Sequence, residues 1–147
     1  MATLIRPREE VFLDTSYALA LSLRTDRHHL TAVSLSAEIE AKQAQAFTTR
    51  AVMLEIGSRL SRERFRAAGV ELLLSLEDDP IISIIPISES LYSQALQLFC
   101  SRPDKEWSLT DCTSFVVMAE RGMTGALTAD KHFEQAGFRA LLLESDD

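Results

Sequence analysis

The chain has little of what would tie it to a membrane or to a disulfide-built scaffold. It holds two cysteines, Cys100 and Cys112, and their spacing matches no CxxC or common metal-ligand motif. No apolar run approaches the roughly 18 residues that a membrane span needs, and the first ten residues, MATLIRPREE, lack the apolar stretch of a signal peptide. We therefore expect a reduced, cytoplasmic protein with no membrane partner.

Positive charge is also in short supply. The 15 Lys and Arg residues face 22 Asp and Glu residues, which gives a formal charge of −7. This balance argues against a simple basic groove for nucleic acid, but it leaves room for a nuclease that reaches phosphate through bound metal ions. Proline and glycine are scarce as well, with no composition shift that would mark a linker. We expect one domain over residues 1–147.

What the chain does have is a regular alternation of short apolar runs and longer helical patterns. Such alternation predicts βαβ units and an α/β fold of three layers, with helices on both faces of a central, mainly parallel, five-stranded sheet. Thr49 is a plausible helix N-cap and Gly122 a plausible helix end. The strands are expected at 10–14, 46–49, 81–87, 124–129 and 138–144, and the helices at 16–24, 28–44, 49–60, 62–77, 88–100, 109–121 and 131–136.

Acidic residues fall where this pattern reaches the carboxyl edge of the sheet, the edge at which open parallel sheets bind ligands. Asp14 ends the first strand, Asp130 follows a later one, and Glu55 and Asp111 lie in the early turns of two helices. Two unit charges about 4 Å apart cost several kcal/mol at an effective dielectric near 20. Either the pKa values rise or a divalent cation lies among the acids. Oxygen ligands favour Mg²⁺ or Mn²⁺, which can promote attack of water on a phosphodiester.

Each of these acids also has an ordinary interpretation. Asp14 could cap the helix that begins near residue 16, and Asp130 could cap the short helix after it. Asp111 could complement a helix dipole, and Glu55 could be a solvated helix residue. The joint placement of all four at one edge favours a functional site, because independent caps have no reason to converge.

Other residues near these acids are weaker candidates. Ser16 could hydrogen-bond Asp14 or a metal-bound water, or cap its helix. Asp104 fits a surface loop better than a fifth site acid, His132 a partly exposed helix residue better than a ligand, and Cys112 the core. Candidate RNA phosphate contacts are Arg24, Arg27, Arg50, Arg59, Arg62 and Arg64.

Four segments together resemble the PIN-domain ribonucleases, a family that includes the VapC-type toxins of bacterial toxin–antitoxin pairs. They are VFLDTS (11–16), TTRAVMLEIGSRL (48–60), WSLTDCTSFVVMAERG (107–122) and GALTADKHFEQAGF (125–138). Each segment alone would be weak, but the four occur in order and span nearly the whole chain.

The resemblance implies a PIN-like fold in which Asp14, Glu55, Asp111 and Asp130 are catalytic and bind Mg²⁺ or Mn²⁺. It also implies an endoribonuclease that cleaves single-stranded RNA, a homodimer, and a partner antitoxin that blocks the site. Many members carry a second acid beside the fourth motif; Ala129 stands there in this chain, which predicts that a second ion is weakly held or arrives only with substrate.

Two other functions stay open from the sequence. One is a non-catalytic PIN-like module that binds RNA or protein. The other is an aspartyl phosphohydrolase with Asp14 as nucleophile, although such enzymes usually carry another acid two residues later, where this chain has Ser16.

Overall fold

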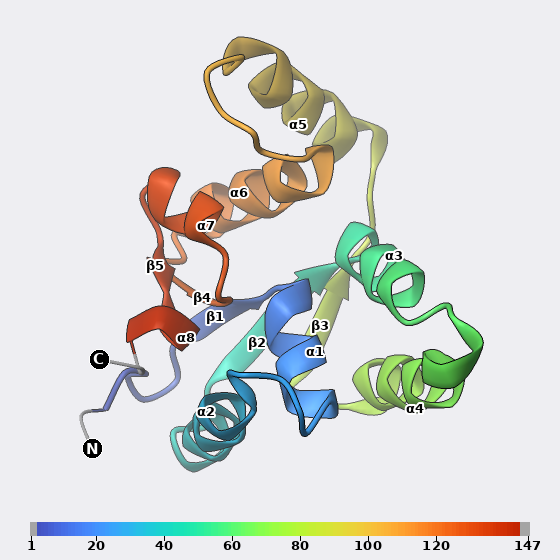
Figure 1. Ribbon diagram of the computed structural model, residues 1–147. Coiled ribbons are helices and arrows are strands. Elements are labelled where there is room, and N and C mark those ends of the chain that lie inside the picture. The colour runs from blue at the N-terminus through green and yellow to red at the C-terminus, as the bar shows by residue number, and fades with distance from the viewer. Residues whose placement is uncertain (1–2, 145–147) are drawn as a thin grey trace.

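A five-stranded sheet forms the centre of the computed structural model, which describes residues 3–144 (Figure 1). The strand order is β3-β2-β1-β4-β5, and every neighbouring pair runs parallel, which confirms the predicted sheet. The strands are β1 (Glu10–Leu13), β2 (Gln45–Thr49), β3 (Ile82–Ile85), β4 (Gly125–Leu127) and β5 (Arg139–Ala140).

This order creates a switch point in the middle of the sheet. From β1 the chain builds outward through β2 to β3 on one side, and from β4 to β5 on the other. In open parallel sheets the crevice beyond the strand ends at such a point is where ligands bind. The residues that follow β1 and β4, Asp14 and Thr128–Asp130, are therefore brought together at this crevice.

Helices cover both faces of the sheet (Figure 1). The first four helices pack against one another on one side, and α5, α6 and α7 pack together on the other. No helix among the described residues is long and apolar enough to span a membrane. The helices are α1 (Thr15–Ser22), α2 (His29–Ala41), α3 (Arg50–Arg59), α4 (Glu63–Asp78), α5 (Glu89–Ser101), α6 (Leu109–Arg121), α7 (Lys131–Gln135) and α8 (Leu141–Glu144).

The predicted element ends agree with the structure in most places and fail at the C-terminal strand. Thr49 caps α3 by accepting a hydrogen bond from the Val52 N–H, and Gly122 ends α6 with φ of 68°, both as expected. The strand predicted at 138–144 is wrong: β5 has two residues, and helix α8 follows directly. Leu141 and Leu142 are both buried, and a short apolar run of this kind fits a buried helix as well as a buried strand.

The core reaches the sheet edge that carries the acids. Phe12 of β1 is fully buried and contacts the ring of Phe133 on α7, with ring centroids 6.3 Å apart. Phe133 in turn meets Phe115 of α6 edge-to-face at 5.0 Å, and Phe115 meets Trp107 at the same distance. Such buried aromatic pairs each stabilise their packing by about 1 kcal/mol beyond area burial. They fix the starts of α6 and α7 relative to β1.

Candidate metal centre

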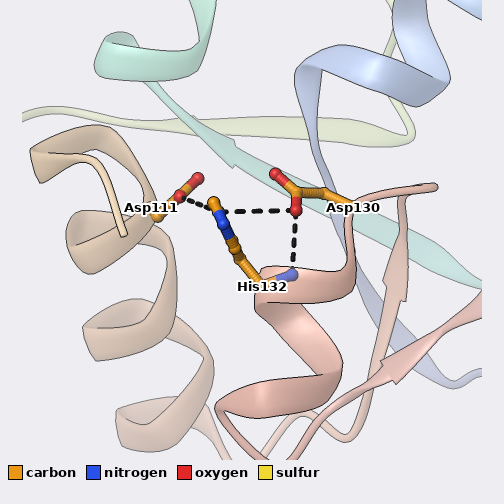
Figure 2. A group of neighbouring side chains, drawn as sticks. All are labelled: Asp111, Asp130 and His132. Carbon is orange, nitrogen blue, oxygen red and sulfur yellow. Dashed lines mark hydrogen bonds and ion pairs between the residues drawn. The ribbon is translucent and has the colours of Figure 1, made fainter. Parts of the chain in front are cut away.

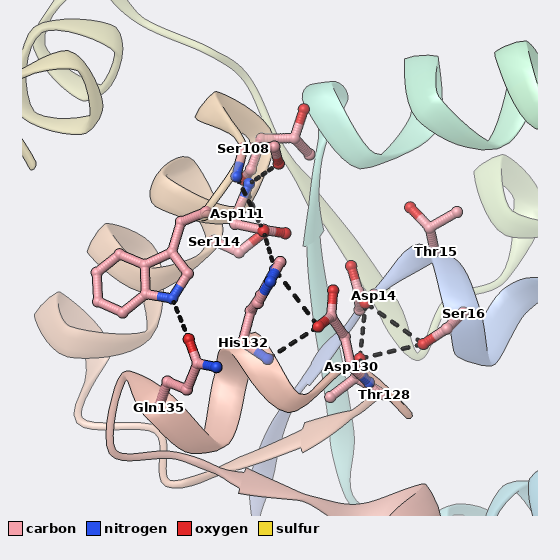
Figure 3. A network of polar contacts seen from close by, with 12 residues as sticks. Asp14, Thr15, Ser16, Ser108, Asp111, Ser114, Thr128, Asp130, His132 and Gln135 are labelled. Carbon is pink, nitrogen blue, oxygen red and sulfur yellow. Dashed lines mark hydrogen bonds and ion pairs between the residues drawn. The ribbon is translucent and has the colours of Figure 1, made fainter. Parts of the chain in front are cut away.

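All four predicted acids line one cavity of about 250 Å³ at the switch point. They come from four separate segments: the end of β1, helix α3, the first turn of α6 and the start of α7. Figure 3 shows three of them with the hydroxyl groups that surround them. Their convergence, predicted from the sequence, is therefore confirmed. Their catalytic and metal-binding roles stay a prediction. The lining residues are Asp14, Thr15, Ser16, Glu55, Arg59, Glu106, Ser108, Asp111, Asp130 and His132.

Asp14 is the most buried of these acids, with 5% of its surface exposed. It stands at the N-cap position of α1, but its side chain makes no capping hydrogen bond, so the simple capping interpretation is wrong. Instead the Thr128 hydroxyl donates to Asp14 Oδ2 at 2.7 Å, and the Ser16 hydroxyl lies 3.4 Å from the same oxygen. Asp14 is held by side chains from both sides of the switch point.

Burial raises the pKa of Asp14 to about 7. The Thr128 hydroxyl and the backbone N–H of Thr15 favour the ionised form and oppose this rise, while the charges of Asp111 and Glu55 add to it. The ionised carboxylate is therefore poorly stabilised by the protein alone.

Asp111 performs two tasks at once. At the start of α6 it forms a capping box with Ser108: the Ser108 hydroxyl accepts from the Asp111 N–H at 3.0 Å, and Asp111 Oδ2 accepts from the Ser108 N–H at 3.1 Å. The same Oδ2 lies 3.0 Å from Nδ1 of His132. Burial raises the pKa of Asp111, against the Ser108 N–H and His132, which favour the ionised form. The helix-end interpretation holds, and it does not remove Asp111 from the cavity.

Asp130 also caps a helix and lines the cavity. Its Oδ1 accepts a hydrogen bond from the His132 N–H at 2.8 Å. This bond caps the N-terminus of α7. Its own N–H donates to the Thr128 hydroxyl at 3.0 Å. Thr128, which the sequence argument did not single out, thus connects Asp130 to Asp14.

Glu55 points from α3 toward the start of α1. It is half-buried and accepts a hydrogen bond from the Thr15 hydroxyl at Oε1, so it is more than a solvated helix residue. Arg59, one turn later, is exposed and lines the same cavity. Among residues 3–144, no Lys or Arg forms an ion pair with Asp14, Glu55, Asp111 or Asp130.

His132 is the site residue that the sequence argument undervalued. It is partly exposed, as expected, but its Nδ1 lies 3.0 Å from Asp111 Oδ2 and 3.4 Å from Asp130 Oδ1 (Figure 2). These three side chains can bring one ligand atom each to a common ion. The sequence did offer one sign of this role: His132 lies two residues after the candidate ligand Asp130, in the first turn of a short helix.

Three further expectations have clear outcomes. Asp104 is exposed and paired with Arg102, as its loop interpretation predicted, and Glu106 lines the cavity in its place. Cys112 is buried in the core, as expected. Ser16 does not cap a helix; its hydroxyl accepts from the Ala129 N–H at 2.9 Å and so joins the segment after β4 to the start of α1.

The cavity fits a divalent cation. Its donors are carboxylate oxygens with one imidazole nitrogen. Arg59 also lines it, but among the described residues no Lys or Arg forms an ion pair with the four acids. Clustered carboxylates in a partly buried pocket repel one another unless protons or a cation intervene. Burial raises the pKa values of Asp14 and Asp111, and neighbouring carboxylates add to the rise; a cation among these acids would favour their ionised forms.

Comparison with known proteins points to one family. The model of the PIN domain matches residues 11–139. The 23S rRNA-specific endonuclease VapC20, from two strains of Mycobacterium tuberculosis, is 30% identical over 128 residues, which is 87% of this chain and 95% of that protein. The crystal structure of M. tuberculosis VapC20, described as a sarcin–ricin loop cleaving toxin, superposes with a TM-score of 0.80 at 28% identity and covers 88% of this chain and 97% of that one.

A more distant structure shares the fold alone. VapBC2 from Rickettsia felis, bound to a DNA fragment from its promoter, matches with a TM-score of 0.64 at 13% identity, over 88% of this chain and 96% of that one.

Proposed function

The chain belongs to the PIN-domain family, and from this premise we propose that it is a divalent-metal-dependent endoribonuclease that hydrolyses single-stranded RNA. The observation that carries the proposal is the cavity lined by Asp14, Glu55, Asp111 and Asp130, none of which pairs with a Lys or Arg among the described residues. A likeness to a nuclease fold without this cavity would support RNA or protein binding only.

The ion we propose is Mg²⁺ or Mn²⁺, held by Asp14, Asp111 and Asp130 with Glu55 beside them. When bound, such an ion supplies positive charge that attracts the scissile phosphate and favours attack of water on phosphorus. Ala129, in place of a second acid next to Asp130, agrees with one firmly held ion.

The chain's own residues hold this constellation in place. Thr128 orients Asp14, and the Ser108 capping box orients Asp111. The Thr15 hydroxyl engages Oε1 of Glu55, which leaves Oε2 to accept the proton of the attacking water. Such supporting hydrogen bonds fix ligand geometry before substrate arrives.

Arg59 is the arginine that we propose for contact with the RNA phosphates, because it is exposed and lines the cavity. Arg50, in contrast, pairs with Glu77. With a net charge of −7, few such contacts are available, so RNA binding should be weak, and each contact should add to its decline with rising salt. The relative VapC20 is named for cleavage of 23S rRNA, which makes ribosomal RNA the first substrate to test.

We also propose that the chain is the toxin of a toxin–antitoxin pair: one PIN-like domain that acts in the cytoplasm as a homodimer and is blocked by an antitoxin. The similarity to VapC20, described as a toxin, supports this role. An open reading frame for a small DNA-binding protein directly upstream of the gene would support it further.

Cleavage of single-stranded RNA tests the nuclease proposal. We expect Mn²⁺-dependent cleavage by the wild-type protein and none by Asp14→Asn or Asp111→Asn. Asp104→Asn is the matched control, because Asp104 is exposed and outside the cavity, and it should cleave like wild type. Equal activity in all four proteins would refute the assignment.

Two outcomes would favour the alternatives. Calorimetry that detects no Mg²⁺ or Mn²⁺ binding at millimolar concentration, even with RNA present, would favour a non-catalytic binding module. Trapping of an acid-labile phosphoenzyme on Asp14 would favour a phosphohydrolase.

A further inference from the structure

We propose that His132 binds the ion directly through Nδ1 and that this nitrogen ligand makes the site prefer Mn²⁺ to Mg²⁺. The inference rests on the proposed metal site and adds a ligand, and a selectivity, that the acids alone do not provide.

The donor spacing around His132 suits a six-coordinate ion. Its Nδ1 lies 3.0 Å from Asp111 Oδ2 and 3.4 Å from Asp130 Oδ1 (Figure 2). Neighbouring donors of an octahedral ion with bonds of about 2.1–2.2 Å are about 3 Å apart. His132 Nδ1 therefore lies at about this spacing from both oxygens, and one ligand atom from each of the three residues lies within 4.8 Å of the others.

Both carboxylate oxygens in this face are oriented by backbone groups. The Ser108 N–H donates to Asp111 Oδ2 at 3.1 Å, and the N–H of His132 itself donates to Asp130 Oδ1 at 2.8 Å. A carboxylate oxygen has a further lone pair after accepting one hydrogen bond. Each oxygen can therefore accept its backbone hydrogen bond and still bind an ion.

The imidazole is positioned from the helix that Asp130 begins. His132 lies in the first turn of α7, and Phe133 beside it is fully buried against Phe12 and Phe115. This packing limits the movement of α7. The ring of His132, with 28% of its side chain exposed, faces Asp111 and Asp130 together (Figure 3).

A nitrogen ligand changes which ion the site favours. Mg²⁺ is bound almost entirely through oxygen. Mn²⁺ also favours oxygen, but it belongs to the first-row series of ions that bind mixed nitrogen and oxygen sites, at the weak end of that series. A site of carboxylates alone would discriminate little between the two. With His132 included, the site should hold Mn²⁺ more tightly.

Pulsed electron paramagnetic resonance tests direct ligation. Tag-free protein loaded with one equivalent of Mn²⁺ should show ¹⁴N coupling from a bound imidazole, and His132→Ala should lose it. His29→Gln is the control: His29 Nδ1 contacts the Ala20 carbonyl, and the residue lies outside the cavity. It should keep the coupling. His132→Asn, which offers an oxygen in place of the nitrogen, should also lose the coupling and carries the test if the alanine variant unfolds.

Calorimetry tests selectivity. The Kd for Mn²⁺ should rise by about 10-fold or more in His132→Ala, and the Kd for Mg²⁺ should change much less. Bound Mn²⁺ without ¹⁴N coupling in the wild type, or coupling that survives in His132→Ala, would overturn the role of His132 and leave the nuclease proposal intact. Failure of the wild type to bind Mn²⁺ at all would overturn both.

Discussion

Asp14→Asn should make the metal-free protein more stable at neutral and alkaline pH while it removes cleavage. Asp14 is 5% exposed, and the described residues offer it hydroxyl and backbone donors but no cation. An asparagine has nearly the same shape, and its amide oxygen can still accept the hydrogen bond from Thr128. The substitution therefore removes the cost of ionising a buried acid and keeps the local packing.

The magnitude follows from the pKa of Asp14, which burial raises from 3.8 to about 7. Because the folded state binds this proton more tightly than the unfolded state, stability falls as pH rises between these two values and then stays level. One pKa unit corresponds to about 1.4 kcal/mol. Ionisation of Asp14 therefore lowers the free energy of unfolding of the wild type by under ~2 kcal/mol at pH 5 and by about 4 kcal/mol at pH 8. The difference in free energy of unfolding between Asp14→Asn and the wild type should therefore grow by about 2–3 kcal/mol between pH 5 and pH 8.

Urea denaturation in EDTA at pH 5 and pH 8 measures this difference, with Asp104→Asn as control. Arg102 lowers the pKa of the Asp104 carboxyl to about 2, so Asp104 is ionised at both pH values and its replacement should give no pH-dependent change. Added Mn²⁺ should stabilise the wild type much more than Asp14→Asn. If the difference between wild type and Asp14→Asn is the same at both pH values, the reasoning from burial fails.

Further predictions concern the ion, a hydroxyl and a helix end. Mn²⁺ must displace the proton of Asp14, so its calorimetric Kd should fall about 10-fold per pH unit up to about pH 7 and change less above it. Thr128→Val removes the hydroxyl that donates to Asp14 and accepts from the N–H of Asp130. The affinity for Mn²⁺, measured by calorimetry, should drop about 10- to 100-fold. An unchanged Kd would show that Thr128 is dispensable for metal binding. Gly122→Ala forces a side chain into the left-handed backbone at φ 68° with no atom near its Cβ; chemical denaturation should show a loss of about 1–2 kcal/mol without loss of cleavage.

The carboxyl edge of the sheet could be predicted from the sequence because it depends on a simple rule. Parallel strands deliver the residues that follow them to one edge, so Asp14 and Asp130 had to lie near each other once β1 and β4 were recognised. Thr49 and Gly122 were predictable for a similar reason, since helix ends depend on local backbone chemistry. These inferences need the order of elements along the chain but no detail of their packing.

The features that the sequence did not reveal depend on packing between elements. Leu141 and Leu142 form a run that suits a strand or a helix, and contact with the rest of the core decides between them. The position of His132 depends on the distance between α6 and α7, which the aromatic contacts of Phe115 and Phe133 determine. Glu106 rather than Asp104 reaches the cavity because of the path of a loop that carries no periodic signal.

Capping and ligand binding, which the sequence argument treated as alternatives, are combined at Asp111 and Asp130. A carboxylate has two oxygens and about four acceptor positions, so a capping hydrogen bond occupies only part of it and fixes the direction of the rest. The helix N-terminus also places partial positive charge beside the acid. Asp14 is different: it stands at the start of α1 without a capping hydrogen bond and is the most buried of the four. Burial therefore penalises the charged form most strongly at Asp14, and the strongest effect of an ion should be felt there.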